Sequence, residues 1–319
     1  MYKSFFGLKE NPFNANPDPR YLYLTKEIEE ALSCLMYGIQ TRKGFLTLTG
    51  EVGTGKTTLV NRLLDWLHLR RTRTAFLFNS RMNSNQLLDF VLAEFDIACE
   101  SRSKSQQLMN LNSWLLERYR AGETVVLIID EAQNLTFPVL EEIRLLTNLE
   151  TPTEKLLQIV LSGQPELEEK LKLPQLRQLR QRIILRSKTN PLSKEQTSDY
   201  ITERLRIAGA APDQSPIFSA KAVETVHLYS LGIPRVINLL CEHSLVNAFA
   251  EQRQTIEPEI VEEIAREFQL DEVEPVAPAG SLRPEADVFT SEAFIQNLGE
   301  ALTRFRAAPT VPLPPRGRK

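Results

Sequence analysis

Residues 50–58 read Gly50-Glu51-Val52-Gly53-Thr54-Gly55-Lys56-Thr57-Thr58. The first eight match the pattern G-x-x-x-x-G-K-[ST], in which backbone N–H groups surround phosphate oxygens, the lysine reaches the β- and γ-phosphates and the hydroxyl residue ligates Mg²⁺. Glycines suit such a loop because it curves around a polyanion with positive φ angles. The bare pattern arises by chance in roughly 1% of chains of this length, so the sequence around it decides its meaning.

The flanks of this loop have the required character. Residues 45–48 form a short apolar run typical of a buried strand, and apolar residues recur at helical spacing from 57 to 69. Strand, glycine-rich turn and amphipathic helix are the context in which the pattern binds a nucleoside triphosphate. We therefore expect residues 50–58 to bind a nucleoside triphosphate, with Lys56 on its phosphates and Thr57 on Mg²⁺.

A second group of chemical residues follows the most apolar strand signal in the chain. Val125-Val126-Leu127-Ile128-Ile129 does not alternate with polar residues, so both faces of this strand should be covered. Asp130 and Glu131 come directly after it. At the carboxyl end of a buried strand beside a phosphate loop, Asp130 is expected to hold hydrated Mg²⁺ and Glu131 to polarise the attacking water.

Strands and helices alternate through the first 190 residues. Further strands are expected at 75–79, 157–161 and 183–186, and further helices at 27–39, 86–95, 106–119, 139–148 and 166–181. This alternation predicts an α/β fold with a parallel sheet and helices on both of its faces.

The strand signals stop after Asn190-Pro191. Helices are expected at 193–207, 219–229, 236–250 and 258–268, the first of them beginning with a capping box formed by Ser193 and Gln196. The predicted domains are therefore an α/β subdomain over 1–190, a helical subdomain over 191–269 and a proline-rich, disordered tail over 270–319. Within the tail, Phe294, Leu298, Leu302 and Phe305 fall on one stripe of a short amphipathic helix.

Several further motifs stand in a fixed order along the chain. They are Asn11-Pro12-Phe13, Pro17-Asp18-Pro19, Tyr37-Gly38-Ile39, Gly50 to Thr58, Asp130-Glu131-Ala132-Gln133-Asn134-Leu135, Gly163-Gln164-Pro165-Glu166-Leu167 and Gly232-Ile233-Pro234-Arg235. Together they resemble the AAA+ ATPases of the general secretion pathway protein A (ExeA-type) family, over about residues 1–268. The Asp-Glu-Ala-Gln signature also relates them to ATPases that accompany transposases.

The resemblance implies a P-loop NTPase fold followed by a small all-α lid, ATP hydrolysis with Mg²⁺, and a homo-oligomer in the form of a ring or filament. It implies a sensor role for Gln164, with Ser162 as the alternative, and contact of Arg235 with the γ-phosphate. Asn11, Phe13 and the segment 37–39 are expected at the adenine.

The resemblance also implies an arginine that reaches the nucleotide of a neighbouring subunit. Arg177, Arg180 and Arg182 precede the last strand, and Arg182 matches the family position best. A solvated basic helix end, favoured by the helix dipole, is the alternative for these residues.

Composition limits where the chain acts and what it binds. The 319 residues carry 38 Lys and Arg against 41 Asp and Glu, a net charge of −3, so nucleic acid is not indicated except through a local patch. Three widely spaced cysteines fit neither a disulfide framework nor a metal site, and no apolar run approaches the ~20 residues of a membrane span. These features predict a cytoplasmic protein without a transmembrane segment.

Two functions remain open from the sequence. The first is an ATPase that drives remodelling or assembly of an unknown protein partner in secretion or pilus biogenesis. The second is an ATP-dependent regulator that binds DNA and recruits a transposase.

Overall fold

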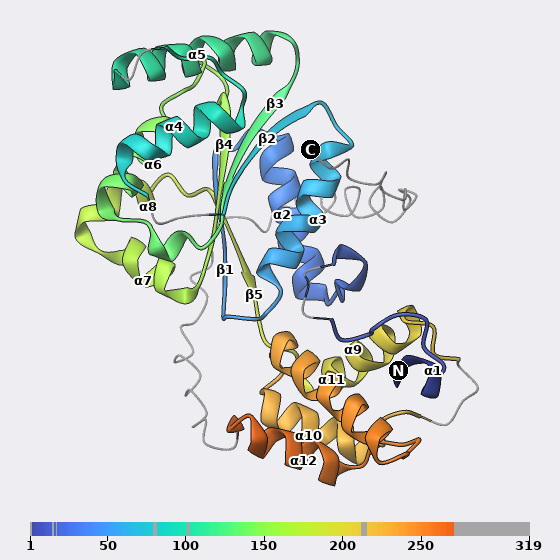
Figure 1. Cartoon of the computed structure of the whole chain (residues 1–319). Coiled ribbons are helices and arrows are strands. Elements are labelled where there is room, and N and C mark those ends of the chain that lie inside the picture. Colours follow the sequence, from blue (N-terminus) through green and yellow to red (C-terminus); the bar gives the residue numbers. More distant parts are fainter. Residues whose placement is uncertain are drawn as a thin grey trace, which may run out of the picture. The chain divides into compact units, whose positions relative to one another are not determined.

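The computed structural model describes residues 2–14, 16, 18–78, 82–100, 103–211 and 216–270 (Figure 1). Within them, parallel strands form one sheet in the order β2-β3-β4-β1-β5. The strands are β1 (Phe45–Gly50), β2 (Thr72–Leu77), β3 (Thr124–Ile129), β4 (Leu157–Gly163) and β5 (Leu185–Thr189). The predicted α/β class with a parallel sheet is confirmed.

Helices cover both faces of this sheet. Figure 1 shows α2 (Lys26–Gln40) and α3 (Lys56–His68) on one face and α4 (Ser84–Glu94), α5 (Lys104–Arg120) and α6 (Phe137–Leu146) on the other. Successive side chains of β3 point to opposite faces, and Val125, Leu127 and Ile129 belong to the core under α4, α5 and α6. Val126 and Ile128 are buried as well. This two-sided burial explains why the strand is apolar without alternation.

The segment between β4 and β5 differs from the prediction of one helix over 166–181, which is wrong. The structure has α7 (Pro165–Lys172), a 3₁₀ turn η3 (Pro174–Leu176) and the short α8 (Arg177–Arg180). Leu173 has extended backbone angles, φ −62° and ψ 142°, because the residue before a proline avoids the helical region and Pro174 has no N–H to donate.

Helices α9 (Lys194–Ile207), α10 (Ala220–Ser230), α11 (Pro234–Ala250) and α12 (Pro258–Glu267) follow the last strand. They share a second apolar core, to which α11 contributes Ile237, Leu240, Cys241 and Leu245. The capping box predicted for Ser193 and Gln196 is present at the start of α9.

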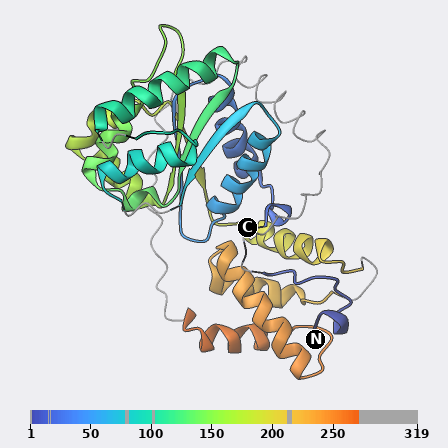
Figure 2. The same ribbon diagram turned by 45° about the horizontal axis from the view of Figure 1, so that its top comes forward.

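The beginning of the chain belongs to this second core. In Figure 2 the start of the chain, with α1 (Tyr2–Phe5), lies beside the helices that follow the last strand. Phe6, Leu8 and Phe13 share one buried core with side chains of α9 to α12. The tyrosine hydroxyl of Tyr2 donates to Glu242 of α11 at 2.8 Å. A segment whose sequence is irregular is therefore held to the helical part of the molecule.

The tail predicted over 270–319, with its helical stripe, lies outside the described residues apart from position 270. No helix in the described part of the chain has the length and apolarity needed to span a bilayer.

Candidate functional site

The glycine-rich loop joins β1 to α3 and leaves the sheet at its carboxyl edge. Gly53 and Gly55 have φ angles of +81° and +94°, which a side chain would strain. A Cβ on Gly53 would also lie 2.7 Å from Cβ of Arg235. The loop is seated on β5 by Thr54, whose hydroxyl is 2.7 Å from that of Thr189. This loop conformation lets the backbone N–H groups at the start of α3 donate hydrogen bonds to an anion.

Lys56 is buried inside this loop. Its Nζ donates to the carbonyl oxygens of Gly50 at 2.7 Å and Glu51 at 2.9 Å. Burial lowers the pKa of Lys56, while the charges of Glu131 and Asp130 act in the opposite direction. The ammonium therefore lies where phosphate oxygens can replace the two carbonyl oxygens as its hydrogen-bond acceptors.

Asp130 lies at the end of β3, next to the start of α3. Its backbone N–H donates to Leu77 of β2 at 2.9 Å, which fixes the turn, and its Oδ2 accepts from the Thr57 hydroxyl at 3.3 Å. A carboxylate and a hydroxyl at this distance form a pair of oxygen donors of the kind that binds Mg²⁺ together with phosphate and water. The structure thus brings together Thr57 and Asp130, the two predicted metal ligands.

Glu131 has a left-handed backbone, with φ 52° and ψ 36°. A residue without glycine's freedom rarely adopts this conformation, and such strain is concentrated at functional sites. Its Oε2 accepts from Nε2 of Gln133 at 2.5 Å and from Nε2 of Gln164 at 3.2 Å. The acid after β3 and the amide after β4 are therefore in direct contact.

Gln164 and Ser162 were the two candidates for the sensor position. Gln164 lines the same cavity as Lys56 and Glu131. Ser162 is fully buried in β4, its hydroxyl has no hydrogen-bond partner in the described structure, and it does not line the cavity. The geometry therefore places Gln164, and not Ser162, at the site.

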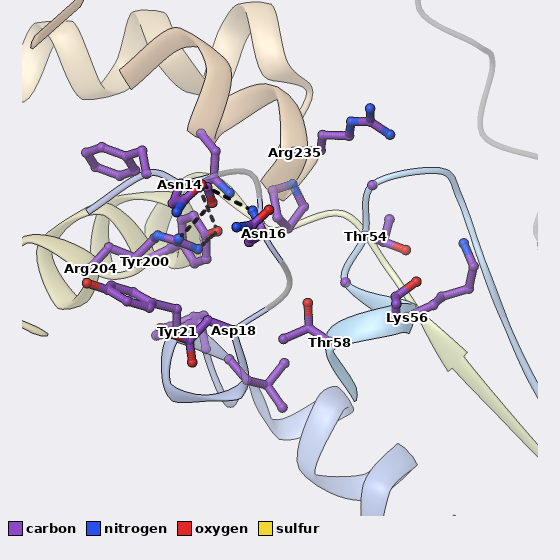
Figure 3. Close-up of a pocket in the computed structure, with 18 of the residues that line it drawn as sticks. Asn14, Asn16, Asp18, Tyr21, Thr54, Lys56, Thr58, Tyr200, Arg204 and Arg235 are labelled. Atoms are coloured by element: carbon purple, nitrogen blue, oxygen red, sulfur yellow. Dashed lines mark hydrogen bonds between the residues drawn. The ribbon is translucent and has the colours of Figure 1, made fainter. Parts of the chain in front are cut away.

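The cavity has a volume of about 660 Å³ and runs from the loop to the N-terminal segment and the helical part of the chain (Figure 3). Loop residues from Val52 to Thr58 line one end. Asn11, Phe13 and Tyr200 line the other end, as does Arg204. Arg235 lies at the start of α11, and its backbone N–H donates to the backbone carbonyl oxygen of Gly53 at 3.2 Å. Its side chain borders the cavity beside the loop (Figure 3).

Two groups of predicted residues lie elsewhere. The segment 37–39, expected at the adenine, does not line this cavity, and Gly38 faces the sheet: a Cβ there would lie 2.3 Å from Leu46 and 2.7 Å from Leu185. Arg182 precedes β5 at the opposite end of the strands from the loop and donates to Oγ1 of Thr147 and Oδ1 of Asn148, both at 2.6 Å.

The sequence reasoning missed a polar cluster on the helical side of the cavity. Arg204 of α9 is buried and donates to the Tyr200 hydroxyl at 2.7 Å, and this hydroxyl donates to Oδ1 of Asn238 at 2.9 Å. A signal was available, because Arg204 lies on the same helical face as Tyr200 and Leu205 and so interrupts an apolar stripe.

The chain is similar to known proteins over most of its length. Residues 39–171 match the family described as AAA domain. The general secretion pathway protein A of Aeromonas hydrophila is 46% identical over 251 residues, which cover 78% of this chain. The chain spans only 45% of the length of that relative.

Solved structures share the fold at low identity. The ORC2 protein of Aeropyrum pernix, in its ADPNP-ADP complexes, has a TM-score of 0.60 at 16% identity, covering 83% of this chain and 73% of its own. Cdc6p of Pyrobaculum aerophilum has a TM-score of 0.60 at 20% identity, and the match covers 83% of this chain and 70% of the Cdc6p chain. The parallel sheet with its phosphate loop and following helices is thus the fold of AAA+ P-loop NTPases. The chain therefore contains an AAA domain with the fold of AAA+ P-loop NTPases, and over 78% of its length it is similar to the general secretion pathway protein A of Aeromonas hydrophila.

Proposed function

We propose that this chain binds ATP with Mg²⁺ in the cavity at the glycine-rich loop and hydrolyses it to remodel or assemble a protein partner in secretion. The observation that carries the proposal is the contact between Glu131 and Gln164 beside Lys56 and the Thr57–Asp130 pair. It supplies an acid, an amide and an ammonium around one point, the set that phosphoryl transfer to water requires.

Each residue has a separate task in this scheme. Backbone N–H groups of the loop and Nζ of Lys56 bind the phosphate oxygens. Mg²⁺, held by Thr57 and Asp130, would offset the charge of the β- and γ-phosphates. Glu131 accepts a proton from the attacking water, and the Gln164 side chain holds that water or a γ-phosphate oxygen in line. Arg235 contacts the γ-phosphate from α11.

The far end of the cavity fits the base. Asn11 and Phe13 line it, and the aromatic ring and amide there suit the flat, polar-edged adenine. These two residues belong to the segment that packs with the helical core. Bound ATP therefore contacts the α/β part through its phosphates and, through its base, the N-terminal segment that packs on the helical part. The division that this supports differs from subdomains over 1–190 and 191–269 at the start of the chain, because Phe6, Leu8 and Phe13 belong to the helical core.

The cellular role rests on the Aeromonas relative, whose name places that protein in general secretion. Hydrolysis coupled to a partner also fits a ring or filament in which neighbouring subunits share a nucleotide. None of the observed contacts favours a transposase as the partner.

The substitution Glu131→Gln tests this function. It keeps the shape and the acceptor oxygen but removes the base, so ATP should bind with the parent's affinity while the hydrolysis rate falls by about 10²-fold or more. Glu169→Gln, at an exposed position of α7, is the matched control and should retain the parent's rate. Steady-state hydrolysis by Glu131→Gln at the parent's rate would remove Glu131 from the proposed role.

A further inference from the structure

The side-chain amide of Gln133 connects two residues of the site. Gln133 lies on the turn η2 (Ala132–Asn134), directly after the acid. Its Nε2 donates to Oε2 of Glu131 at 2.5 Å, and its Oε1 accepts from the backbone N–H of Gln164 at 3.1 Å. One amide thus spans the gap between the ends of β3 and β4.

The contact with Gln164 fixes the direction of this amide. A backbone N–H can only donate, so the Gln133 atom that faces it must be the oxygen. The –NH₂ group then faces the carboxylate of Glu131, which in its ionised form can only accept. Both hydrogen bonds are satisfied in one orientation, and turning the amide over would break both.

Neighbouring residues hold Gln133 in this place. The Lys170 ammonium of α7 donates to the backbone carbonyl of Gln133, and it donates to that of Leu135 at 3.0 Å. Gly163 provides the space for the amide, because a Cβ at that position would lie 2.9 Å from Oε1 of Gln133. The turn after β3 is therefore tied to α7 through both its backbone and its side chain.

The consequence falls on Glu131. Two amide groups, those of Gln133 and Gln164, donate to the same carboxylate oxygen, so the direction of the carboxylate is defined before any ligand enters. A free glutamate samples several rotamers, and confining it in advance lowers the entropic cost of reaching the reactive arrangement. Gln133 does not line the cavity, so it acts through Glu131.

We propose that Gln133 is a positioning residue that sets the direction of the Glu131 carboxylate toward the γ-phosphate. This inference rests on the proposed ATPase function. It separates Gln133 from the residues that bind nucleotide, since its loss should affect the turnover of bound ATP and leave ATP affinity unchanged.

Two substitutions at this position distinguish its two hydrogen bonds. Gln133→Met keeps the length of the side chain and removes both bonds, whereas Gln133→Glu keeps an acceptor for the Gln164 N–H and removes the donor to Glu131. We expect both to lower kcat about tenfold or more, with KM for ATP and the affinity for ATP within twofold of the parent. Asn134→Ala, at an exposed position of the same turn, should leave kcat unchanged.

A third variant approaches the same amide from the opposite side. Gly163→Ala puts a methyl group against Oε1 of Gln133 and should lower kcat without changing ATP affinity. Parental kcat in Gln133→Glu would show that donation to Glu131 is dispensable and would overturn the proposal. A loss of ATP affinity and melting temperature in Gln133→Met, with kcat unchanged, would also overturn it.

Crystal structures of the parent and Gln133→Met give a readout that needs no hydrolysis. In the variant we expect Oε2 of Glu131 to leave Nε2 of Gln164, to which it is bonded at 3.2 Å in the parent. If the contact persists in Gln133→Met, the positioning role is wrong whether or not the chain is an ATPase. If the parent binds ATP but does not hydrolyse it, the proposed function fails while this structural comparison still decides the inference.

Discussion

The guanidinium of Arg204 donates through Nε to the carbonyl oxygen of Pro12 at 2.5 Å, which joins α9 to the segment that begins the chain. Around it lie the rings of Tyr21, Tyr200 and Phe13, with centroids 4.5, 5.3 and 5.9 Å from Cζ. A buried cation needs such partners, because leaving water is costly unless hydrogen bonds and aromatic faces replace it. One side chain of the helical part therefore holds the segment that lines the far end of the cavity.

Replacing Arg204 by Met should consequently weaken both stability and ATP binding. The Pro12 carbonyl would lose its donor inside the protein, which costs about 1–3 kcal/mol of unfolding free energy. We expect a lower melting temperature by calorimetry and a raised Kd for ATP. Arg206→Met, two residues along on the exposed side of α9, is the matched control and should change neither. Equal effects of the two substitutions would contradict the role given to Arg204.

Lys56→Ala tests the loop itself. The ammonium is the main cationic contact available to the phosphates within the loop, so ATP binding and hydrolysis should be lost together. Equilibrium binding of labelled ATP measures the first and phosphate release the second. Lys172→Ala at the exposed end of α7 is the control. Binding of labelled ATP to Lys56→Ala with the parent's affinity would refute our account of the loop.

Local patterns were sufficient to predict the sheet and the loop. Val125 to Ile129 could only be a strand covered on both faces, and a glycine-rich turn between strand and helix leaves few conformations. The carboxyl ends of parallel strands meet at one edge, which is why Asp130 could be predicted beside Thr57 although 73 residues separate them.

Other features depend on contacts that no local pattern encodes. The segment 37–39 was assigned to the adenine because of its motif, but Gly38 serves close packing of α2 against Leu46 and Leu185. Phe13 belongs to the core of helices that come some 180 residues later, and this follows only from the tertiary fold. The break before Pro174 was readable from the sequence and was overlooked.

Glu168 links three elements beneath the loop and should make stability depend on pH. It lies on α7 and accepts from the Thr49 hydroxyl of β1 and from Nζ of Lys188 of β5, the latter at 2.8 Å. Burial acts to raise the pKa of Glu168, but the hydrogen bonds from Lys188 and Thr49 outweigh it, so the pKa lies below its ordinary value of 4.5.

The sign of the effect follows from that direction. A carboxyl whose pKa is lower in the folded than in the unfolded chain contributes stability above the unfolded value, and the contribution is lost as pH falls through the folded pKa. The melting temperature of Glu168→Gln should therefore lie below that of the parent at pH 7, and the gap should narrow below pH 4.5. Circular dichroism melts at several pH values measure it, and a gap that stays constant would contradict the assignment.

Arg182 raises the question of assembly. Its guanidinium is bonded to Thr147 and Asn148 within its own chain, at the opposite end of the strands from its own loop. Arg177 is exposed and Arg180 half-buried on α8. None of the three lines the cavity of its own chain, so any of them can reach a nucleotide only in a neighbouring subunit.

An isolated subunit has few cations to offset the charge that develops on the γ-phosphate in the transition state, and an arginine supplied by a neighbour is worth on the order of 10³-fold in related phosphoryl transfers. We therefore predict that the hydrolysis rate per subunit rises with protein concentration and that Arg182→Ala lowers turnover without lowering ATP affinity. Lys56→Ala subunits added to the parent should reduce its activity more than dilution does.

If Arg177→Ala alone reproduces the loss, the acting arginine is Arg177, and the hydrogen bonds of Arg182 to Thr147 and Asn148 are its whole function. A rate per subunit that stays flat from nanomolar to high micromolar protein, with only monomers in light scattering with ATP, would rule out a shared site. Arg177 and Arg180 would then only stabilise a short helix through its dipole, and Arg182 would only make its hydrogen bonds to Thr147 and Asn148.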